Sequence, residues 1–130
     1  MNYNKIVESC FFQPKHIGVL DLSLPFTVTV RAGDPEHGEF FDLYWQSNEA
    51  GQIVRTCFKA YGNPYLIAAL EWVCRHCEQT SLTGHPSLDY RLLVEKLEIP
   101  AQLYAIALKV EKSYKDIVNL MNSRLEKSND

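Results

Sequence analysis

The side chains best suited to chemistry in this chain are His37 and Glu39, which flank Gly38 in a predicted loop. Imidazole and carboxylate groups both bind zinc or iron. Two ligands do not close a tetrahedral site, so tight binding requires a third group from a partner. The loop therefore predicts either a weak zinc or iron site at His37 and Glu39 or a solvated segment without an ion.

A second candidate position lies in the turn Tyr61-Gly62-Asn63-Pro64. A β-type run ends just before this turn, and an apolar-periodic helix follows it. A strand-to-helix turn presents its tip residue beside the open amides of the helix start, which is a good place for a ligand or an anion. The residue at the tip is Asn63, a weak ligand for a transition metal.

The cysteines at positions 10, 57, 74 and 77 offer a different chemistry, because Cys74-x-x-Cys77 has the spacing of a redox pair or half a zinc site. Redox pairs favour a helix N-terminus, whereas this pair lies well inside a predicted helix. No second pair of this spacing exists to complete a zinc site. The apolar residues of the helix share one predicted buried face: Leu66, Ile67, Leu70, Val73, Cys74 and Cys77. We therefore predict that both cysteines are core residues.

Composition narrows the class of protein. The 130 residues predict a single domain, 1–130, and a hydrophobic content of 46% is enough for a real core. A net charge of −3 gives no reason to expect nucleic acid, and no signal segment or membrane span is present, which predicts a soluble cytoplasmic protein. The other histidines, His16, His76 and His85, share no spacing and are interpreted as structural or solvent-facing. No nucleophile–base set is visible, so an enzyme is not expected.

The order of predicted elements indicates an α+β fold of two layers. Alternating hydrophobicity predicts strands over 26–30, 39–47 and 52–60, with a hairpin turn at 48–51, and hence an antiparallel three-stranded meander. Helices are predicted over 2–12, 64–79, 88–97 and 101–126. The last helix carries a core-facing stripe: Leu103, Ile106, Ala107, Val110, Tyr114, Ile117, Leu120, Met121 and Leu125. On the 64–79 helix, Tyr65 and Trp72 are expected to be exposed and partner-facing.

Four segments in this order resemble the iron–sulfur cluster assembly scaffolds of the NifU N-terminal (IscU-like) family. Segment 13–18, Gln-Pro-Lys-His-Ile-Gly, resembles the family's Asn-Pro-Arg-Asn-Val-Gly, and segment 33–39 resembles its first ligand loop, Gly-Ala-Pro-Ala-Cys-Gly-Asp. Phe58-Lys59 and Tyr61-Gly62 match the second ligand loop. Segment 97–100, Leu-Glu-Ile-Pro, lies where the family has Leu-Ala-Leu-Pro ahead of its third ligand. The resemblance covers nearly the whole chain and implies the three-stranded sheet with helices packed on it.

The departures from this family concern its ligands. His37 stands at the first cysteine position and Asn63 at the second, while the third falls on Ile106 or, in the alternative register of Pro100, on Ala105. Glu39 retains a carboxylate where the family has aspartate. The family's Hsp70-type chaperone motif, Leu-Pro-Pro-Val-Lys, reads here as Ile-Pro-Ala-Gln-Leu over 99–103.

The resemblance implies a divergent scaffold-type protein that has lost the cluster-building thiolates, the favoured ligands of such clusters. It implies no cofactor in the purified protein beyond weak zinc or iron, and a function in binding an assembly partner such as the cysteine desulfurase. The family's desulfurase contact maps to Tyr3, Ile6, Val7 and residues 34–39. The alternative is a metal- or small-molecule-binding domain that reuses the vestigial pocket, with His37, Glu39 and Asn63 as its polar lining.

Overall fold

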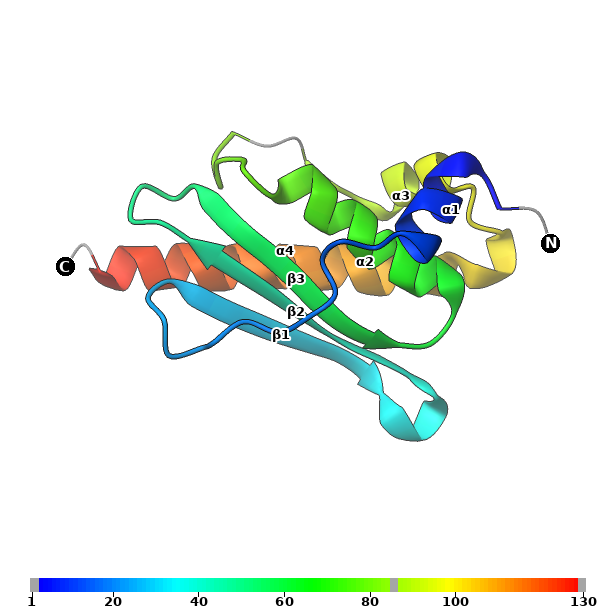
Figure 1. Ribbon diagram of the computed structural model, residues 1–130, viewed down its shortest axis with the longest axis horizontal. Coiled ribbons are helices and arrows are strands. Elements are labelled where there is room, and N and C mark those ends of the chain that lie inside the picture. The colour runs from blue at the N-terminus through cyan, green and yellow to red at the C-terminus, as the bar shows by residue number, and fades with distance from the viewer. Residues whose placement is uncertain (1–2, 85–86, 129–130) are drawn as a thin grey trace.

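The computed structural model describes residues 3–84 and 87–128 (Figure 1). The elements follow in the order α1 (Lys5–Phe12), β1 (Thr27–Asp34), η1 (Pro35–His37), β2 (Glu39–Ser47), β3 (Ile53–Tyr61), α2 (Pro64–Cys77), α3 (Tyr90–Leu97), η2 (Ala101–Leu103) and α4 (Tyr104–Ser128). Helix α1 begins at Lys5 because the side chain of Asn4 accepts a hydrogen bond from the Val7 amide and caps the first turn.

The three strands form the predicted antiparallel meander in the order β1-β2-β3. Strand β1 continues to Asp34, four residues beyond the predicted end at 30, because its pairing with β2 continues to the partners Asp34 and Glu39. The predicted turn after β2 is present, and the Asn48 side chain accepts hydrogen bonds from the Ala50 and Gln52 amides within it. The sheet was therefore predicted correctly in topology and too short in its first strand.

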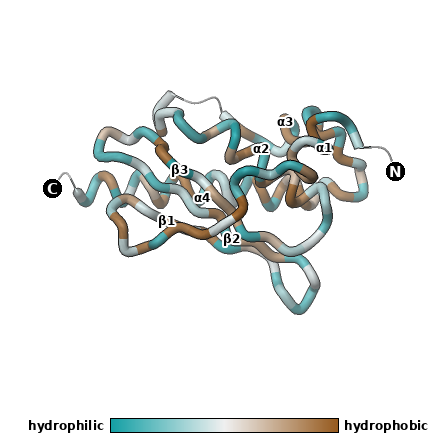
Figure 2. The backbone as a smooth tube through the Cα atoms, viewed as in Figure 1, coloured by the Kyte–Doolittle hydropathy of each residue, from teal (hydrophilic) through white to brown (hydrophobic). Residues whose placement is uncertain are grey.

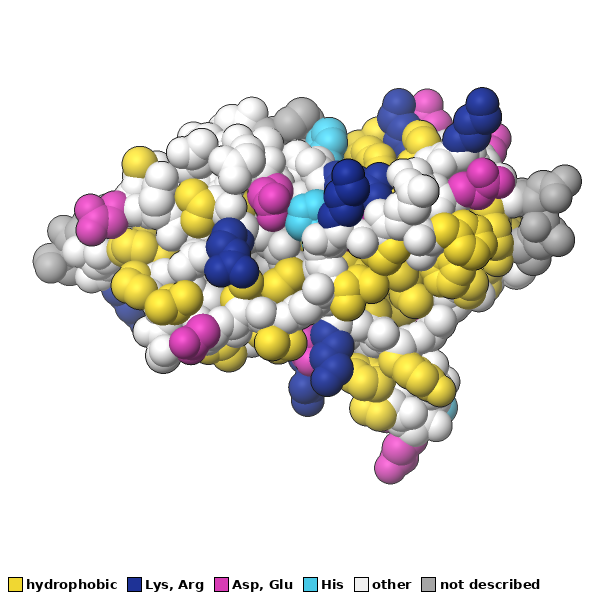
Figure 3. All heavy atoms as spheres, in the orientation of Figure 1, with side chains coloured by type: hydrophobic (Ala, Val, Ile, Leu, Met, Phe, Trp, Pro, Cys, Tyr) yellow, Lys and Arg dark blue, Asp and Glu magenta, His cyan; other side chains and the backbone are white. Residues whose placement is uncertain are grey.

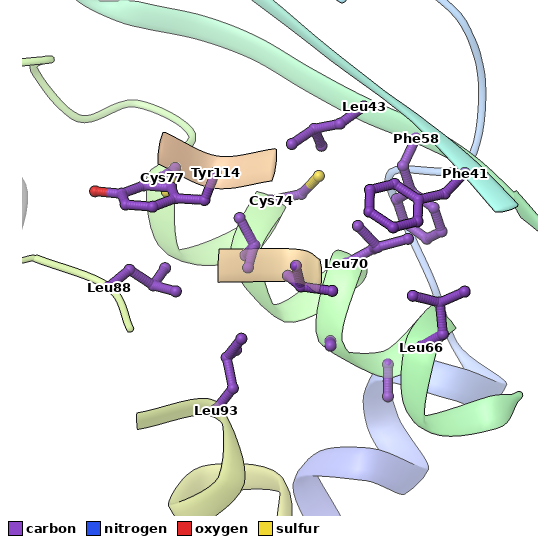
Figure 4. Packing of buried hydrophobic residues seen from close by; sticks show 14 of the residues in the cluster. Phe41, Leu43, Phe58, Leu66, Leu70, Cys74, Cys77, Leu88, Leu93 and Tyr114 are labelled. Atoms are coloured by element: carbon purple, nitrogen blue, oxygen red, sulfur yellow. The ribbon is translucent and has the colours of Figure 1, made fainter. Parts of the chain in front are cut away.

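The fold has the two layers expected from the sequence. Helices α2 and α4 pack across one face of the sheet, with α2 against β3 and α4 against β1 and β2 (Figure 1). Phe41, Leu43 and Trp45 alternate along β2 and are fully buried beneath these helices. Figure 4 shows Leu66, Leu70, Cys74 and Cys77 of α2 in the same core, with Phe41 and Phe58 from the sheet.

The last helix shows the expected stripe with one exception. Hydrophobic and hydrophilic residues alternate along α4 (Figure 2), and Ile106, Val110 and Ile117 are buried. Leu120, which the spacing places on the stripe, is 37% exposed, whereas its neighbour Met121 is fully buried. The prediction for Leu120 was wrong because a helix buries only the part of its apolar face that meets another element.

Charged side chains of both signs are scattered over the visible surface, and histidine, acidic and basic side chains gather near its middle (Figure 3). Of the helices in residues 3–84 and 87–128, none combines the length and apolar character that crossing a bilayer requires.

Candidate functional site

Glu39 is the point at which three distant segments of the chain meet. The first residue of β2 is Glu39, and the next residue, Phe40, pairs with Tyr61 at the end of β3. This register places Glu39 beside Gly62 in the turn before α2. From α4, the Nζ atom of Lys109 lies 3.5 Å from Glu39 Oε1. The β1–β2 loop, the β3–α2 turn and the first turns of α4 thus converge at one end of the molecule, here called the ligand end.

Two glycines make the close packing of Glu39 possible. Gly62 has a φ of +151°, and a Cβ atom there would lie 2.9 Å from Glu39 Cγ and 3.2 Å from Leu66 Cδ2. Gly33 has a φ of +88°, and a Cβ atom there would lie 2.4 Å from the Glu39 carbonyl oxygen. A larger residue at position 62 would push the β3–α2 turn away from Glu39, and one at position 33 would disturb the pairing of β1 with β2 beside it.

His37 is an exposed loop residue paired with its own loop. Its side chain is 82% exposed, and Nδ1 lies 2.8 Å from Oδ2 of Asp34. The other carboxylate oxygen of Asp34 accepts a hydrogen bond from the Glu36 amide, so Asp34 caps η1 while holding the imidazole. One of the two nitrogens that could bind a metal is therefore already engaged.

Asn63 serves the start of helix α2. Its Oδ1 atom accepts a hydrogen bond of 2.8 Å from the Tyr65 amide, and Pro64 occupies the first helical position. This is the usual arrangement of an N-cap followed by proline. The oxygen that would bind a metal is the oxygen that caps the helix.

Neither candidate for the third ligand position carries a donor atom for a metal. Ile106 is 4% exposed and belongs to the hydrophobic core, so in that register the position has become a packing position. Ala105 is exposed and lies one turn before Lys109, whose ammonium group contacts Glu39. Among the described residues, no group of three or more His, Cys, Asp or Glu side chains is placed to hold a metal ion. The predicted weak metal site at His37 and Glu39 thus has no third protein ligand within this part of the chain.

The four cysteines lie in the interior, as predicted for Cys74 and Cys77. Both are fully buried, Cys10 is 1% exposed and Cys57 is 7% exposed. Burial raises the pKa of the Cys77 thiol to about 12 and that of Cys57 to about 11, and it raises the pKa of Cys74 well above its usual value. Protonated, buried thiols are poor nucleophiles and poor metal ligands.

The predicted partner-facing residues divide into buried and accessible ones. The expectation was wrong for Tyr65, which is 4% exposed because the Tyr3 ring packs edge-on against it with the ring centroids 5.3 Å apart. Val7 is fully buried on the inner side of α1 and is not available to a partner. Ile6 is 37% exposed and Trp72 is half-buried.

Ile6 and Trp72 line a common hollow between α1 and α2, with a cavity volume of about 400 Å³. The Trp72 ring stacks on His76 with an interplanar angle of 11° and a centroid separation of 4.8 Å. His76 is therefore structural, which is one of the two interpretations that the sequence left open. His85 lies outside the described residues.

The strongest polar cluster in the structure was missed by the sequence analysis. The carboxylate of Glu71 on α2 is fully buried and accepts hydrogen bonds of 2.9 Å from the Lys15 and His16 amides. It also lies 2.6 Å from His16 Nδ1 and 2.8 Å from Arg75 Nε. The other nitrogen of this imidazole, His16 Nε2, lies 3.4 Å from Glu78 Oε2. One signal was available: Glu71 lies one turn after Ile67, at the edge of the predicted buried face, where a charge requires partners.

This cluster ties the segment after α1 to the rest of the fold. Arg75 donates to the Ser9 hydroxyl and to the Gln13 carbonyl oxygen, and the Phe58 amide of β3 donates to the His16 carbonyl oxygen. His16 is therefore structural and largely buried, and it joins α2 to the edge of the sheet.

Comparison with known proteins agrees with this geometry. The crystal structure of a nitrogen-fixing NifU-like protein (N-terminal) from Brucella abortus matches with a TM-score of 0.58 at 17% identity, over 95% of this chain and 94% of that one, which establishes the fold. None of the curated proteins matches the chain. The model of the family described as NifU-like N terminal domain matches residues 2–124. The chain therefore belongs to the NifU-like N-terminal domain family.

Proposed function

We propose that this chain is a divergent scaffold-type protein of iron–sulfur cluster assembly that does not build a cluster alone and acts by binding assembly partners. The observation that carries the proposal is the use of the three ligand positions. His37 pairs with Asp34, Asn63 caps α2, and the third position is either Ile106, which packs in the core, or the exposed Ala105. None of these positions presents a thiolate.

These residues do not fit an iron–sulfur cluster as cargo. Such clusters are held mainly by cysteine thiolates, and the ligand end offers an imidazole, an amide oxygen and carboxylates. The cysteines of the chain are buried elsewhere, so they do not substitute for the missing ligands. The shape of the ligand end nevertheless persists, since Glu39 still connects the β1–β2 loop with the β3–α2 turn and α4.

A retained shape without ligands favours a role in partner binding, with a cysteine desulfurase as the first candidate partner. The accessible residues for such a contact are Tyr3, Ile6 and the exposed loop 34–38, together with the half-buried Trp72. Val7 and Tyr65 support this surface from beneath. No catalytic step is required of the chain in this function.

The first test asks whether the protein acquires a cluster. The purified protein is supplied with iron, sulfide and a desulfurase, beside a three-cysteine scaffold as positive control. We expect no stable charge-transfer absorption from this chain. Absorption that survives the combined changes Cys57→Ala, Cys74→Ala and Cys77→Ala would contradict the proposal. Stoichiometric zinc or iron in protein purified without a metal-binding tag would favour the metal-binding alternative.

The second test measures partner binding by pull-down from the extract of the source cell, followed by a binding assay with the recovered desulfurase. Ile6→Asp is expected to weaken binding by on the order of tenfold, because it places a charge in an apolar contact. Leu120→Asp is the matched control, since Leu120 is also 37% exposed but lies on α4. Failure to recover a desulfurase, or equal loss of binding in both variants, would oppose this partner assignment.

A further inference from the structure

We infer that Lys109 takes the place of a metal ion at the ligand end: its ammonium group neutralises Glu39, and its side chain covers Ala105, the third ligand position in one of the two registers. This inference rests on the proposed function, because it gives a reason why the ligand end of a scaffold-type fold takes up no metal ion. Lys109 thereby has a role at the ligand end, although it occupies none of the ligand positions.

The position of Lys109 on α4 carries the first part of the argument. Side chains of an α-helix lean toward its N-terminus, so a residue covers the surface over the preceding turn. Lys109 therefore extends over Ala105 and reaches Glu39 with Nζ 3.5 Å from Oε1. In the register that places the third ligand at Ala105, the lysine side chain thus lies over the ligand position.

The charges at the ligand end carry the second part. The Glu39 side chain is only 25% exposed and lies against Gly62. A partly buried carboxylate is stabilised by a nearby cation, and in a metal site the ion itself supplies that charge. The other charged groups of the loop are Asp34, which pairs with His37, and the exposed Glu36. Lys109 is the cation that contacts Glu39 in the described part of the chain.

An ammonium group and a divalent cation repel each other, so both do not occupy the same side of Glu39. The lysine side chain is 47% exposed, and ion pairs of this kind add little to stability. The consequence of Lys109 therefore lies in the charge that it places at the ligand end. Restoring cysteines alone would leave this positive charge in the site.

The test is zinc affinity in a matched set of variants. The changes His37→Cys and Asn63→Cys are combined with Ala105→Cys in one series and with Ile106→Cys in another. Each series is made with Lys109 unchanged, with Lys109→Met, which keeps the length and removes the charge, and with Lys109→Arg, which keeps the charge. Lys112→Met is the control, because Lys112 is on α4 but pairs with Asp116. Circular dichroism verifies folding, and a competing chelator reports the zinc Kd.

We expect Lys109→Met to tighten zinc binding by on the order of tenfold or more in at least one series, because one repulsive charge is removed. Lys109→Arg and Lys112→Met are expected to leave the Kd within about twofold. Equal zinc affinity with and without the Lys109→Met change in both series would overturn the inference, and so would the absence of zinc binding in every variant. The measurement uses no partner protein, so its failure is distinguishable from a failure to bind a desulfurase.

A second experiment uses the unmodified protein and does not depend on folding of the variants. A carbodiimide activates a carboxylate, and attack by an adjacent lysine amine forms an amide bond with net loss of one water. The expected product joins the Glu39 carboxyl carbon to Lys109 Nζ and is identified by peptide mass spectrometry. The Lys112–Asp116 pair, at 2.7 Å, is the internal positive control. Cross-linking of the control pair without the Glu39–Lys109 product would refute the inference.

Discussion

The interior side of α2 and the ligand end hold polar groups in opposite ways. The Glu71 carboxylate is fully buried and receives contacts from two amides, an imidazole and a guanidinium. At the ligand end, His37 is 82% exposed with a single carboxylate partner, and Glu39 has one ammonium group at 3.5 Å. The Glu71 cluster, with its many polar contacts, is thus structural. The ligand end, where the family has its metal ligands, is loosely held.

This difference indicates how the fold is held without metal ligands at these positions. A buried cluster holds the segment after α1 against α2 and β3, so α2 is anchored by groups beyond its N-terminal turn. The ligand end is then free to change its side chains as long as Gly33 and Gly62 let the loops approach Glu39. The densest polar bonding and the positions of the family's ligands therefore lie in separate parts of the molecule.

The largest expected effect comes from breaking the buried cluster. Glu71→Ala leaves His16 Nδ1, Arg75 Nε and two backbone amides without the carboxylate that they contact, which costs about 3–5 kcal/mol of unfolding free energy. Asp116→Ala is the matched control, because its pair with Lys112 is exposed and contributes about 0–1 kcal/mol. Urea unfolding measures both. Similar values for the two variants would remove the contrast between the regions.

The next largest effect is expected at the third ligand position. This position falls on the buried Ile106 in one register and on the exposed Ala105 in the other. Ile106→Ala is expected to cost about 2–5 kcal/mol, since Ile106 is buried in the core. Leu108→Ala, on the same helix and 47% exposed, is expected to change stability by about 0.5 kcal/mol or less. A small effect at Ile106 would mean that this position belongs to the loosely held end after all.

The sequence predicted the parts of the fold that repeat a local pattern. Alternation at Phe41, Leu43 and Trp45 identified β2 with its observed bounds, and the turn at 61–64 identified the start of α2. These features depend on residues close in sequence, whose periodicity is set by the backbone itself. The same reasoning located Cys74 and Cys77 in the core.

The misses depend on contacts between distant residues. Tyr65 is buried because Tyr3 of the N-terminal segment covers it, and Glu71 is buried because the amides at Lys15 and His16 satisfy it. Neither contact produces a periodic pattern of residue types in the sequence of either segment. At the ligand end, the sequence identified His37, Glu39 and Asn63 through a family resemblance, but Lys109 belongs to no family motif and was found only from its distance to Glu39.

The pH dependence of the unfolding free energy distinguishes a buried thiol of α2, such as Cys77, from a thiol that serves as a metal ligand. The pKa of Cys77 is raised from 9.0 to about 12, so the unfolded chain loses this proton first as the pH rises. The stabilisation is complete below pH 9 and declines between pH 9 and about 12, with a slope of about 1.4 kcal/mol per pH unit for each such thiol. Urea unfolding across this interval should show a shallower decline for Cys77→Ala, in which Tyr114 and the other cysteines still titrate. An unchanged slope would mean that Cys77 ionises as readily in the folded protein.

The smallest expected effects concern the first two ligand positions. Asn63→Ala removes the N-cap of α2 and is expected to cost about 1 kcal/mol, whereas Asn63→Asp keeps an oxygen for the Tyr65 amide and should retain most of the stability. His37→Ala removes only an exposed pair with Asp34 and should change the unfolding free energy by about 0.5 kcal/mol or less. Thermal and urea unfolding of the three variants gives the order directly. If His37→Ala proved as costly as Asn63→Ala, the β1–β2 loop would be as firmly held as the helix start, and the ligand end would have to be regarded as a rigid site.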